Sequence, residues 1–566
     1  MHILCLFLTV TIPYNIAPLY DGWKVDEWHQ FLEAHKGEDV EFNVGGNIIT
    51  NHVSEYPIDE YLTYRLIPPS YTGFNEIGIY QRNLTNFDEV PLYRNSQSKL
   101  KQCVNCHTYN AADPDEYLFH VRAYEGGTVI MSKKYGARKV DLKRAGFIGA
   151  GVYPAWHPSG DYIAFSQNET RQLFYREHPD KIEVIDLQSD LVLYSLADDK
   201  LIPIEQEKTI FETFPTWSPD GTKLYSCRAR TDFAALGTNE VARAEDVKNA
   251  TTNLFYDLVV RDFSVGGLPG GQTLPLGPEV GGDPRAPRLS EPRMLVDGRV
   301  SHRSVTLPRV SPDGRWLIMT VGPWGQFHIW HHDSDLWEID LKENTLRPLS
   351  EINSNNVESY HTFSSNGRWM VFSSRRDDGA FTRPYFAAFD PETGKFDAPF
   401  ILPPRFKGDH EERFFSYNVP EFSTGPVKMS NAETRMLIKN WLDPQLRSWH
   451  FIPHVGSYIL SYLFLIAAAL CWRWRYRKYL TAAGLVFMAS GLIFGSLWGH
   501  VAWGTYWRWD PKETLALITF LTFISSVIIE GVSLTGKRVF LPATKRSAGL
   551  ILHILGLLLI TITAYL

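Results

Sequence analysis

Five consecutive residues, Cys103-Val104-Asn105-Cys106-His107, combine two thiols and an imidazole at close spacing. Covalent attachment of haem uses this set, because two thiols add to the two vinyl groups and a histidine directly after the second thiol ligates the iron. A gap of two residues would place both sulfurs on one side of a helical turn, and we expect that conformation here. His120 and Met131 follow in the chain and are candidates for the second axial ligand.

Two other uses of a Cys-x-x-Cys pair compete with haem attachment. One is half of a zinc site, but the chain has five cysteines and no second pair with this spacing. The other is a thioredoxin-like redox pair, but no βαβ pattern surrounds the motif. The cysteine spacing suggests no disulfide framework. The motif therefore favours a covalently bound c-type haem at Cys103 and Cys106, with His107 on the iron.

A second constellation runs from Trp498 to Thr514 and reads WGHVAWGTYWRWDPKET. Its indole rings, at Trp498, Trp503, Trp507 and Trp509, could form an aromatic belt at the membrane interface, or they could stack on a flat porphyrin. Glycines between them bring backbone close to a ligand, and the charged run that begins at Asp510 would be costly at the mouth of a membrane helix unless it has a function. These features favour a cofactor platform over a plain belt.

Four apolar stretches surround this constellation, at residues 451–472, 480–497, 514–534 and 548–566. Each has the length that a helix needs to cross a bilayer. Lysines and arginines gather between the first and second stretches and between the third and fourth, which predicts that these two loops are cytoplasmic. The chain before residue 451 and the tryptophan-rich loop would then lie on the outer side of the membrane.

The charge is divided between these parts. The formal net charge of the chain is −7. Residues 451–566 contain 10 Lys and Arg against 3 Asp and Glu, which leaves −14 for the first 450 residues. An acidic soluble part on a basic membrane part argues against a nucleic acid as the partner.

A weak repeat of hairpin turns marks the middle of the chain, at residues 153–160, 214–221, 307–314 and 360–367. Two of these turns read Ser-Pro-Asp-Gly, and each of the four is followed by a run of alternating apolar residues, as in hairpins. Such repeats predict the blades of a β-propeller, and the region resembles the TolB-type propeller family. We therefore expect a multidomain protein, with an all-β propeller followed by an all-α segment of four transmembrane helices.

The predicted boundaries are as follows. A β-rich N-terminal domain covers residues 1–100, and residues 1–12 are either a signal peptide or a first strand. The haem-attachment segment covers residues 101–135, and the propeller covers 140–402 with a Gly- and Pro-rich insertion at 265–292. A linker at 403–448 leads to the transmembrane domain at 449–566.

The tryptophan-rich stretch resembles the signature of the cytochrome c assembly family of the CcsA type, over residues 449–566. The resemblance implies a non-covalently bound haem b at the outer face of a bacterial inner membrane, which is delivered to apocytochrome c together with other assembly membrane proteins. It implies that His454 ligates the iron. It further implies a haem platform formed by Trp498, Trp503, Trp507, Trp509 and Asp510, with Arg508 and Lys512 near the haem propionates.

The sequence departs from that family at its other histidines. Residues 523–529, in the helix after the signature, contain no histidine, and none follows the last span. His500 and His553 are further candidate ligands.

Three functions remain open: haem delivery in cytochrome c assembly, a membrane-anchored c-type cytochrome, and a propeller scaffold for protein partners. The resemblance implies haem–cysteine thioether ligation as the activity. The sequence contains no hydrolase motif.

Overall fold

The structure is a computed structural model. It divides the chain into a β unit (Met1–Leu142 and Ile148–Asn440) and a helical unit (Trp441–Leu566, together with Lys143–Phe147). Each unit is considered by itself. The described residues are 10–68, 75–97, 103–122, 126–144, 146–174, 180, 182–204, 207, 209–231, 254–266, 274–275, 286–439, 451–471, 477–503, 506–507, 509, 511–529 and 543–565.

A small lobe begins the described chain. Strand β1 (Val10–Pro13) pairs in parallel with β3 (Asn47–Ser54), which pairs antiparallel with β2 (Asp39–Val44). Helix α1 (Val25–Ala34) buries one apolar face, where Trp28 donates its indole hydrogen to the Ile16 carbonyl at 2.9 Å. The end of the apolar run at residues 1–12 is therefore a strand. Residues 1–9, on which the predicted signal peptide depends, lie outside the described residues.

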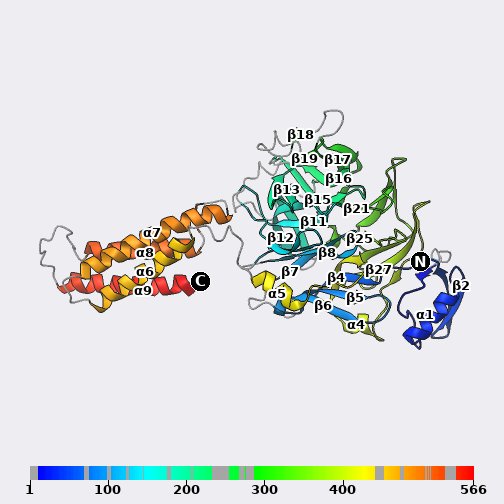
Figure 1. Ribbon diagram of the computed structural model, residues 1–566, viewed down its shortest axis with the longest axis horizontal. Coiled ribbons are helices and arrows are strands. Elements are labelled where there is room, and N and C mark those ends of the chain that lie inside the picture. The colour runs from blue at the N-terminus through cyan, green and yellow to red at the C-terminus, as the bar shows by residue number, and fades with distance from the viewer. Residues whose placement is uncertain are drawn as a thin grey trace. The chain divides into compact units, whose positions relative to one another are not determined.

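Six antiparallel sheets make up the rest of the β unit (Figure 1). The first two sheets contain β7 (Val104–Asn110), β8 (Asp113–Val121), β9 (Gly127–Ser132) and β10 (Gly136–Val140), and β11 (Gly151–Trp156), β12 (Tyr162–Phe174), β13 (Ile182–Ser195) and β14 (Lys200–Pro203). The third contains β15 (Ile210–Trp217), β16 (Lys223–Arg230) and β17 (Asp257–Val265) with β18 (Leu274–Pro275), β19 (Pro287–Leu289) and β20 (Arg293–Val296), and the fourth contains β21 (Ser304–Val310), β22 (Trp316–Gly322), β23 (Asp335–Asp340) and β24 (Thr345–Pro348). The fifth contains β25 (Glu358–Phe363), β26 (Trp369–Ser374), β27 (Arg383–Asp390), β28 (Lys395–Phe396) and β29 (Phe400–Ile401), and the sixth contains β30 (Ser416–Ser423), β4 (Tyr61–Ile67), β5 (Gly78–Asn83) and β6 (Glu89–Arg94). Short helices α3 (Gly298–Ser301), α4 (Asp409–Glu412) and α5 (Asn431–Lys439) accompany them.

The six innermost strands form a closed ring, so the β unit is propeller-like. Strands β7, β11, β15, β21, β25 and β30 contact one another in that order, and β30 contacts β7 again. The ring closes because β30 pairs with β4, a strand from the beginning of the chain. In Figure 1 the labelled innermost strands lie toward the middle of the β unit, and α1 and β2 lie at its edge.

The ring differs from the predicted boundaries. It begins at β4 and ends at β30, whereas the sequence analysis placed the propeller at 140–402. Residues 61–94 and 104–140 are blades, not parts of separate domains, and residues 416–423 are a strand, not a linker. Within the insertion at 265–292, β19 pairs with β17, and most of the remaining residues lie outside the described part of the chain.

Glycines set the turns that the repeat predicts. Gly160, Gly221, Gly314 and Gly367 all have positive φ, between 65° and 78°, which an L residue rarely adopts. In the second of these turns Ser218 donates its hydroxyl to Asp220 at 2.5 Å and accepts the Lys223 amide hydrogen at 3.0 Å. The turn chemistry thus recurs from blade to blade.

The helical unit contains α6 (Phe451–Leu470), α7 (Arg477–Trp503), α8 (Pro511–Ile529) and α9 (Ala543–Tyr565). Three of its segments are long and apolar enough to span a membrane: Ile452–Leu470, Arg477–Trp498 and Lys512–Ile529. The apolar part described for α9 is shorter, at Ser547–Ile562.

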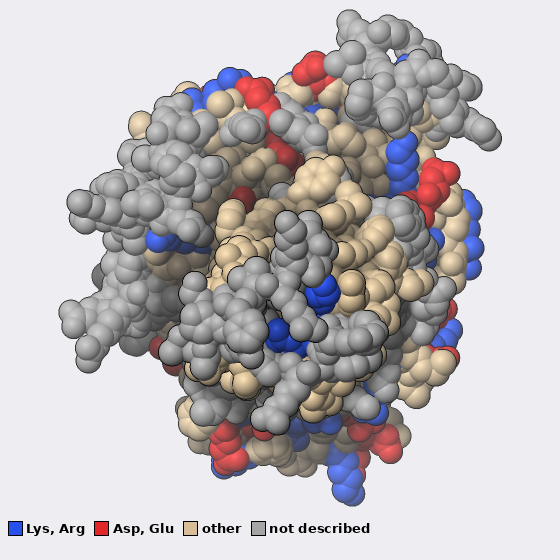
Figure 2. Space-filling view, turned by 90° about the vertical axis from the view of Figure 1, so that its left-hand side faces the viewer, with Lys and Arg blue, Asp and Glu red and all other residues tan. Residues whose placement is uncertain are grey.

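Large apolar side chains on this unit face outward. Ile452 is 76% exposed and Leu470 is 82% exposed. Figure 2 shows that most of the described surface at the centre of the view belongs to residues that are neither acidic nor basic, with a few basic side chains among them. Outward-facing apolar side chains suit a lipid environment, so this is a membrane protein with three candidate spans. The fourth predicted span is present as a helix.

Candidate functional site

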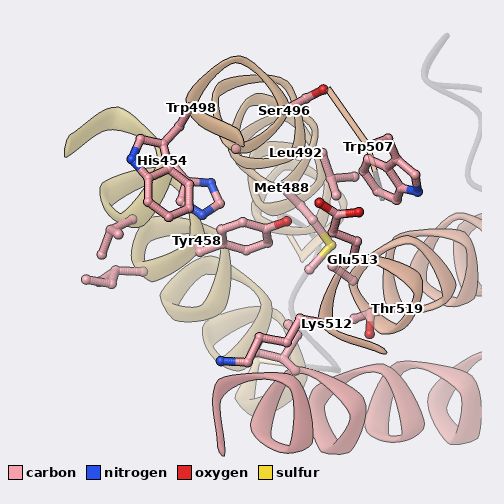
Figure 3. A pocket seen from close by; sticks show the side chains of 15 residues that line it. His454, Tyr458, Met488, Leu492, Ser496, Trp498, Trp507, Lys512, Glu513 and Thr519 are labelled. Atoms are coloured by element: carbon pink, nitrogen blue, oxygen red, sulfur yellow. The ribbon is translucent and has the colours of Figure 1, made fainter. Parts of the chain in front are cut away.

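A cavity of about 510 Å³ lies within the helical unit (Figure 3). Its volume falls in the range of cofactor and small-molecule sites in proteins. The wall is mainly apolar and aromatic. It is lined by His454, Val455, Tyr458, Ile459, Met488, Leu492, Gly495, Ser496, Trp498, Trp507, Lys512, Glu513, Ala516, Thr519 and Ile560.

His454 is held in one orientation and one tautomer. Its Nδ1 lies 2.8 Å from the Gly491 carbonyl oxygen on α7. A carbonyl oxygen only accepts, so Nδ1 carries the proton and Nε2 keeps a free electron pair. The ring stacks on Trp498 with centroids 6.0 Å apart and planes 13° apart, and Tyr458 meets it edge-on at 5.2 Å. A histidine fixed in this way is prepared to ligate a metal through Nε2.

Two glycines on α7 allow α6 to approach so closely. A Cβ atom at Gly495 would lie 2.5 Å from His454 Cε1, and one at Gly491 would lie 3.0 Å from the Tyr458 ring. Small residues four apart are typical of close helix packing in membranes. The spacing of Gly491 and Gly495 in an apolar stretch indicates close helix packing, and this signal in the sequence was missed.

The opposite side of the cavity comes from the tryptophan-rich segment and the start of α8. Figure 3 shows Trp507 across from His454 and Trp498, with the Met488 sulfur and the Glu513 carboxylate between them. Glu513 lies in the first turn of α8, where the helix dipole favours a negative charge.

The structure brings together only some of the predicted residues. His454, Trp498 and Trp507 line the cavity, as does Lys512. Trp509 is 70% exposed and meets Trp507 edge-on at 5.9 Å. The side chains of Trp503 and His500, and the whole of Arg508 and Asp510, lie outside the described residues.

His553 has a place in helix packing. It is 1% exposed, its Nε2 donates to the Leu465 carbonyl at 3.0 Å, and Phe523 meets its ring edge-on. This hydrogen bond joins α9 to α6. The structure does not place His553 among the residues that line the cavity.

The cavity residues fit a haem. One imidazole has a free Nε2 electron pair, indole and phenol rings offer flat faces to a porphyrin, and Lys512 offers a cation to a carboxylate. The apolar remainder of the wall suits the macrocycle.

The Cys103–His107 motif does not form the helical turn that the sequence analysis expected. Residues from Val104 onward belong to β7, the innermost strand of its blade. Cys106 has a φ of 50° and lies in a bulge between Asn105 and Thr108. All the other innermost strands carry the same bulge, with a φ of 40° to 53° at Tyr153, Phe214, Leu307, Tyr360 and Val419. The helical expectation was wrong because the propeller repeat dictates this backbone.

His107 also occupies a repeat position. The run Cys106-His-Thr-Tyr109 corresponds to Tyr360-His-Thr-Phe363, and His361 donates Nε2–H to the Ile318 carbonyl of the neighbouring blade at 2.9 Å. This correspondence was present in the sequence and was missed.

The packing of His107 does not suit a covalent haem. Its side chain is 2% exposed, close to the backbone of Thr63 and Val419, and burial lowers its pKa to about 4. Among the described residues neither ring nitrogen has a partner in hydrogen-bonding geometry. Cys106 keeps partial exposure whereas His107 is enclosed between blades. A haem held by both thiols and His107 therefore does not fit this arrangement.

The two further axial candidates lie within the same sheet. His120, on β8, is 6% exposed and its Nδ1 lies 2.7 Å from the Thr128 hydroxyl. Met131, on β9, pairs with Tyr117 and packs against the core of that blade. Burial lowers the pKa of His120 to about 3. Both side chains are accounted for by blade packing.

Comparison with known proteins separates the two units. The family described as "Cytochrome C assembly protein" matches residues 473–566. The cytochrome c biogenesis protein CcsA of Citrus sinensis is 47% identical over 51 residues, which are 9% of this chain and 16% of that protein. CcsA of Lactuca sativa is 33% identical over 102 residues, which are 18% of this chain and 27% of that protein.

Similarity to solved structures is distant. The alignment with the tricorn protease covers 72% of this chain and 36% of the protease chain, at 12% identity and a TM-score of 0.32. The propeller-like arrangement described above therefore stands on its own strand pairing. The chain spans between 16% and 27% of the length of the CcsA relatives named here. Its C-terminal part is related to the CcsA cytochrome c biogenesis proteins.

Proposed function

We propose that the helical unit binds haem b in the cavity, through Nε2 of His454, and presents it during cytochrome c assembly. The observation that carries this proposal is the hydrogen bond from His454 Nδ1 to the Gly491 carbonyl, because it fixes the tautomer that a haem ligand needs. The bound haem supplies the group that apocytochrome c receives. Trp498 and Trp507 would offer flat faces to the macrocycle, and Lys512 would offer a cation to a propionate.

The proposed partners are apocytochrome c and other membrane proteins of cytochrome c assembly. The matched part of the chain covers only 16% to 27% of the length of these CcsA proteins, and we propose that the helical unit acts together with other membrane proteins in a complex. We propose that the cavity and the β unit face the outer side of a bacterial inner membrane, because the basic loops favour a cytoplasmic position for residues 473–478 and 537–546. Reporter fusions at residue 440 should then be active outside the cytoplasm, and fusions at residue 540 inside it; the opposite pattern would reverse the topology.

The haem content of the purified full-length chain tests the haem proposal. Protein from a haem-competent host should show a Soret band whose pigment is extracted by acid–acetone. His454→Ala should lose this band, and added imidazole should restore part of it, because free imidazole can occupy the vacated ligand position. His302→Ala, an exposed histidine of the β unit, serves as the control. Equal haem content in all three proteins would refute the proposal.

The same extraction tests the prediction of covalent haem at Cys103 and Cys106. Haem that stays with the polypeptide would support it, and would require β7 to leave its blade. Complete extraction is the result expected from the packing of His107.

A further inference from the structure

The six bulges of the β unit surround the central axis of its ring of strands, and we call this central region the central tunnel. Five of the six bulge residues, Cys106, Tyr153, Leu307, Tyr360 and Val419, keep partial exposure, although they lie in the innermost strands. The residue after each of them is buried. Solvent-accessible side chains in the middle of a closed ring indicate a space that water or a ligand can enter.

Two guanidinium groups reach this tunnel. Arg309 follows the bulge of the innermost strand β21 and keeps partial exposure, and it interacts electrostatically with Tyr360 of the next blade and with Glu421 of the blade after that. Arg65, on β4, donates to Cys103 Sγ at 3.2 Å and interacts with both Cys106 and Tyr360. Two cations from different blades thus converge on one region.

Neither cation is neutralised by an ion pair. Among the described residues no carboxylate lies within ion-pair distance of Arg309 or Arg65. Nε of Arg65 is buried without a hydrogen-bond partner in the described part of the chain. Glu421 accepts hydrogen bonds from Thr108 and from the Tyr109 amide, and burial raises its pKa to about 7, which weakens it as a counter-ion.

A cation that is partly withdrawn from bulk water without a nearby carboxylate is costly, and a bound anion reduces that cost. The guanidinium fork matches carboxylate and phosphate oxygens in a bidentate manner. We propose that the central tunnel of the β unit binds a small oxyanion, a carboxylate or a phosphate, between Arg65 and Arg309. This site lies in the β unit and does not depend on the haem cavity.

An extension of strands β12 and β13 covers one end of the central tunnel. Strands β12 and β13 extend beyond their blade, and on this extension Asp186 accepts hydrogen bonds from Tyr256 on the next blade and, at 3.4 Å, from Gln326 on the blade after it. Glu183, on the same extension, contacts His331 at 2.7 Å, and both side chains are buried. Asp186 also interacts electrostatically with the tunnel residue Tyr153. The hairpin therefore spans this mouth from blade to blade and shields the site from bulk water.

Calorimetric titration of the full-length chain in detergent tests the site, with succinate and inorganic phosphate as probes. At least one probe should bind the wild type, and the probe that binds identifies the oxyanion class. Arg309→Gln and Arg65→Gln should each weaken that probe by about tenfold or more, as expected for loss of a charge-assisted hydrogen bond. Arg293→Gln, at an exposed position of β20, should bind like the wild type.

Two results would overturn the proposal: no binding of either probe at millimolar concentration, or binding that Arg309→Gln and Arg65→Gln leave unchanged. If Arg309→Gln does not fold, Arg309→Lys keeps the charge and loses the fork, and it should bind more weakly than the wild type; equal affinity would count against the site. Haem absorption should be unaffected in every variant, so failure of this site leaves the haem proposal intact.

Discussion

We expect the substitution Gly495→Ala, which adds a single methyl group, to weaken haem binding without destabilising the helix. The Cβ atom of alanine would lie 2.5 Å from His454 Cε1 and 2.6 Å from Nδ1, closer than carbon and nitrogen atoms approach without bonding. The imidazole must therefore move, and the 2.8 Å hydrogen bond to the Gly491 carbonyl cannot survive. Alanine favours a helix over glycine by about 1 kcal/mol, so the helix itself should not suffer.

The expected loss follows from the role of that hydrogen bond. Removal of a partner that orients a ligating histidine typically lowers metal affinity by about 10- to 100-fold, or about 1.4 to 2.8 kcal/mol. We expect Gly495→Ala to weaken haem binding within this range. Titration of haem into the detergent-purified full chain, followed at the Soret band, measures the effect.

Two glycine variants provide matched controls. Gly456→Ala, on α6, adds a methyl group into open space and should bind haem like the wild type. Gly484→Ala, on α7, places its Cβ 2.7 Å from Leu465 Cγ and disturbs the contact between α6 and α7 without reaching His454. Haem affinity of Gly495→Ala equal to that of the wild type would refute the reasoning, and so would an equal loss in Gly484→Ala.

Three further predictions concern the β unit. His361→Ala leaves a carbonyl of the neighbouring blade without its donor, so we expect a loss of about 1–3 kcal/mol in urea unfolding, and an unchanged midpoint would contradict this. Burial raises the pKa of Asp186 to about 7. The contribution of Asp186 to the free energy of unfolding is therefore present below the unfolded pKa near 4 and disappears as the pH rises toward 7. Asp186→Asn should make the free energy of unfolding depend less steeply on pH between these values. Gly394 has a φ of 73° and its Cβ would lie 2.5 Å from Trp316, so Gly394→Ala should lower the Tm more than Gly46→Ala, where φ is also positive but space is open.

Local signals in the sequence predicted much of this architecture. The four glycine turns at residues 153–160, 214–221, 307–314 and 360–367 predicted four of the blades, because a glycine with positive φ leaves a signature within a few residues. The apolar lengths predicted the helices of the membrane part. The resemblance directed attention to His454, Trp498 and Trp507, and these side chains do meet at one cavity.

Non-local features escaped the sequence. The blade that contains β4 is completed by β30, so neither stretch of sequence contains all the strands of a blade. The spacing of Cys103 and Cys106 is compatible with either a turn of helix or a bulged strand, and only the neighbouring blades decide between them. The hydrogen bond from His454 to the Gly491 carbonyl depends on how α6 approaches α7, which residue types do not specify.

The order of synthesis has a consequence for the ring. Strand β4 leaves the ribosome early, but its partner β30 is made about 350 residues later, shortly before the first membrane helix. Until then the nascent β unit carries two open strand edges, which are prone to pair with other chains. Maturation of the β unit should therefore depend on chaperones that shield these edges while translation proceeds. A ribosome that stalls before residue 416 would leave a product unable to close.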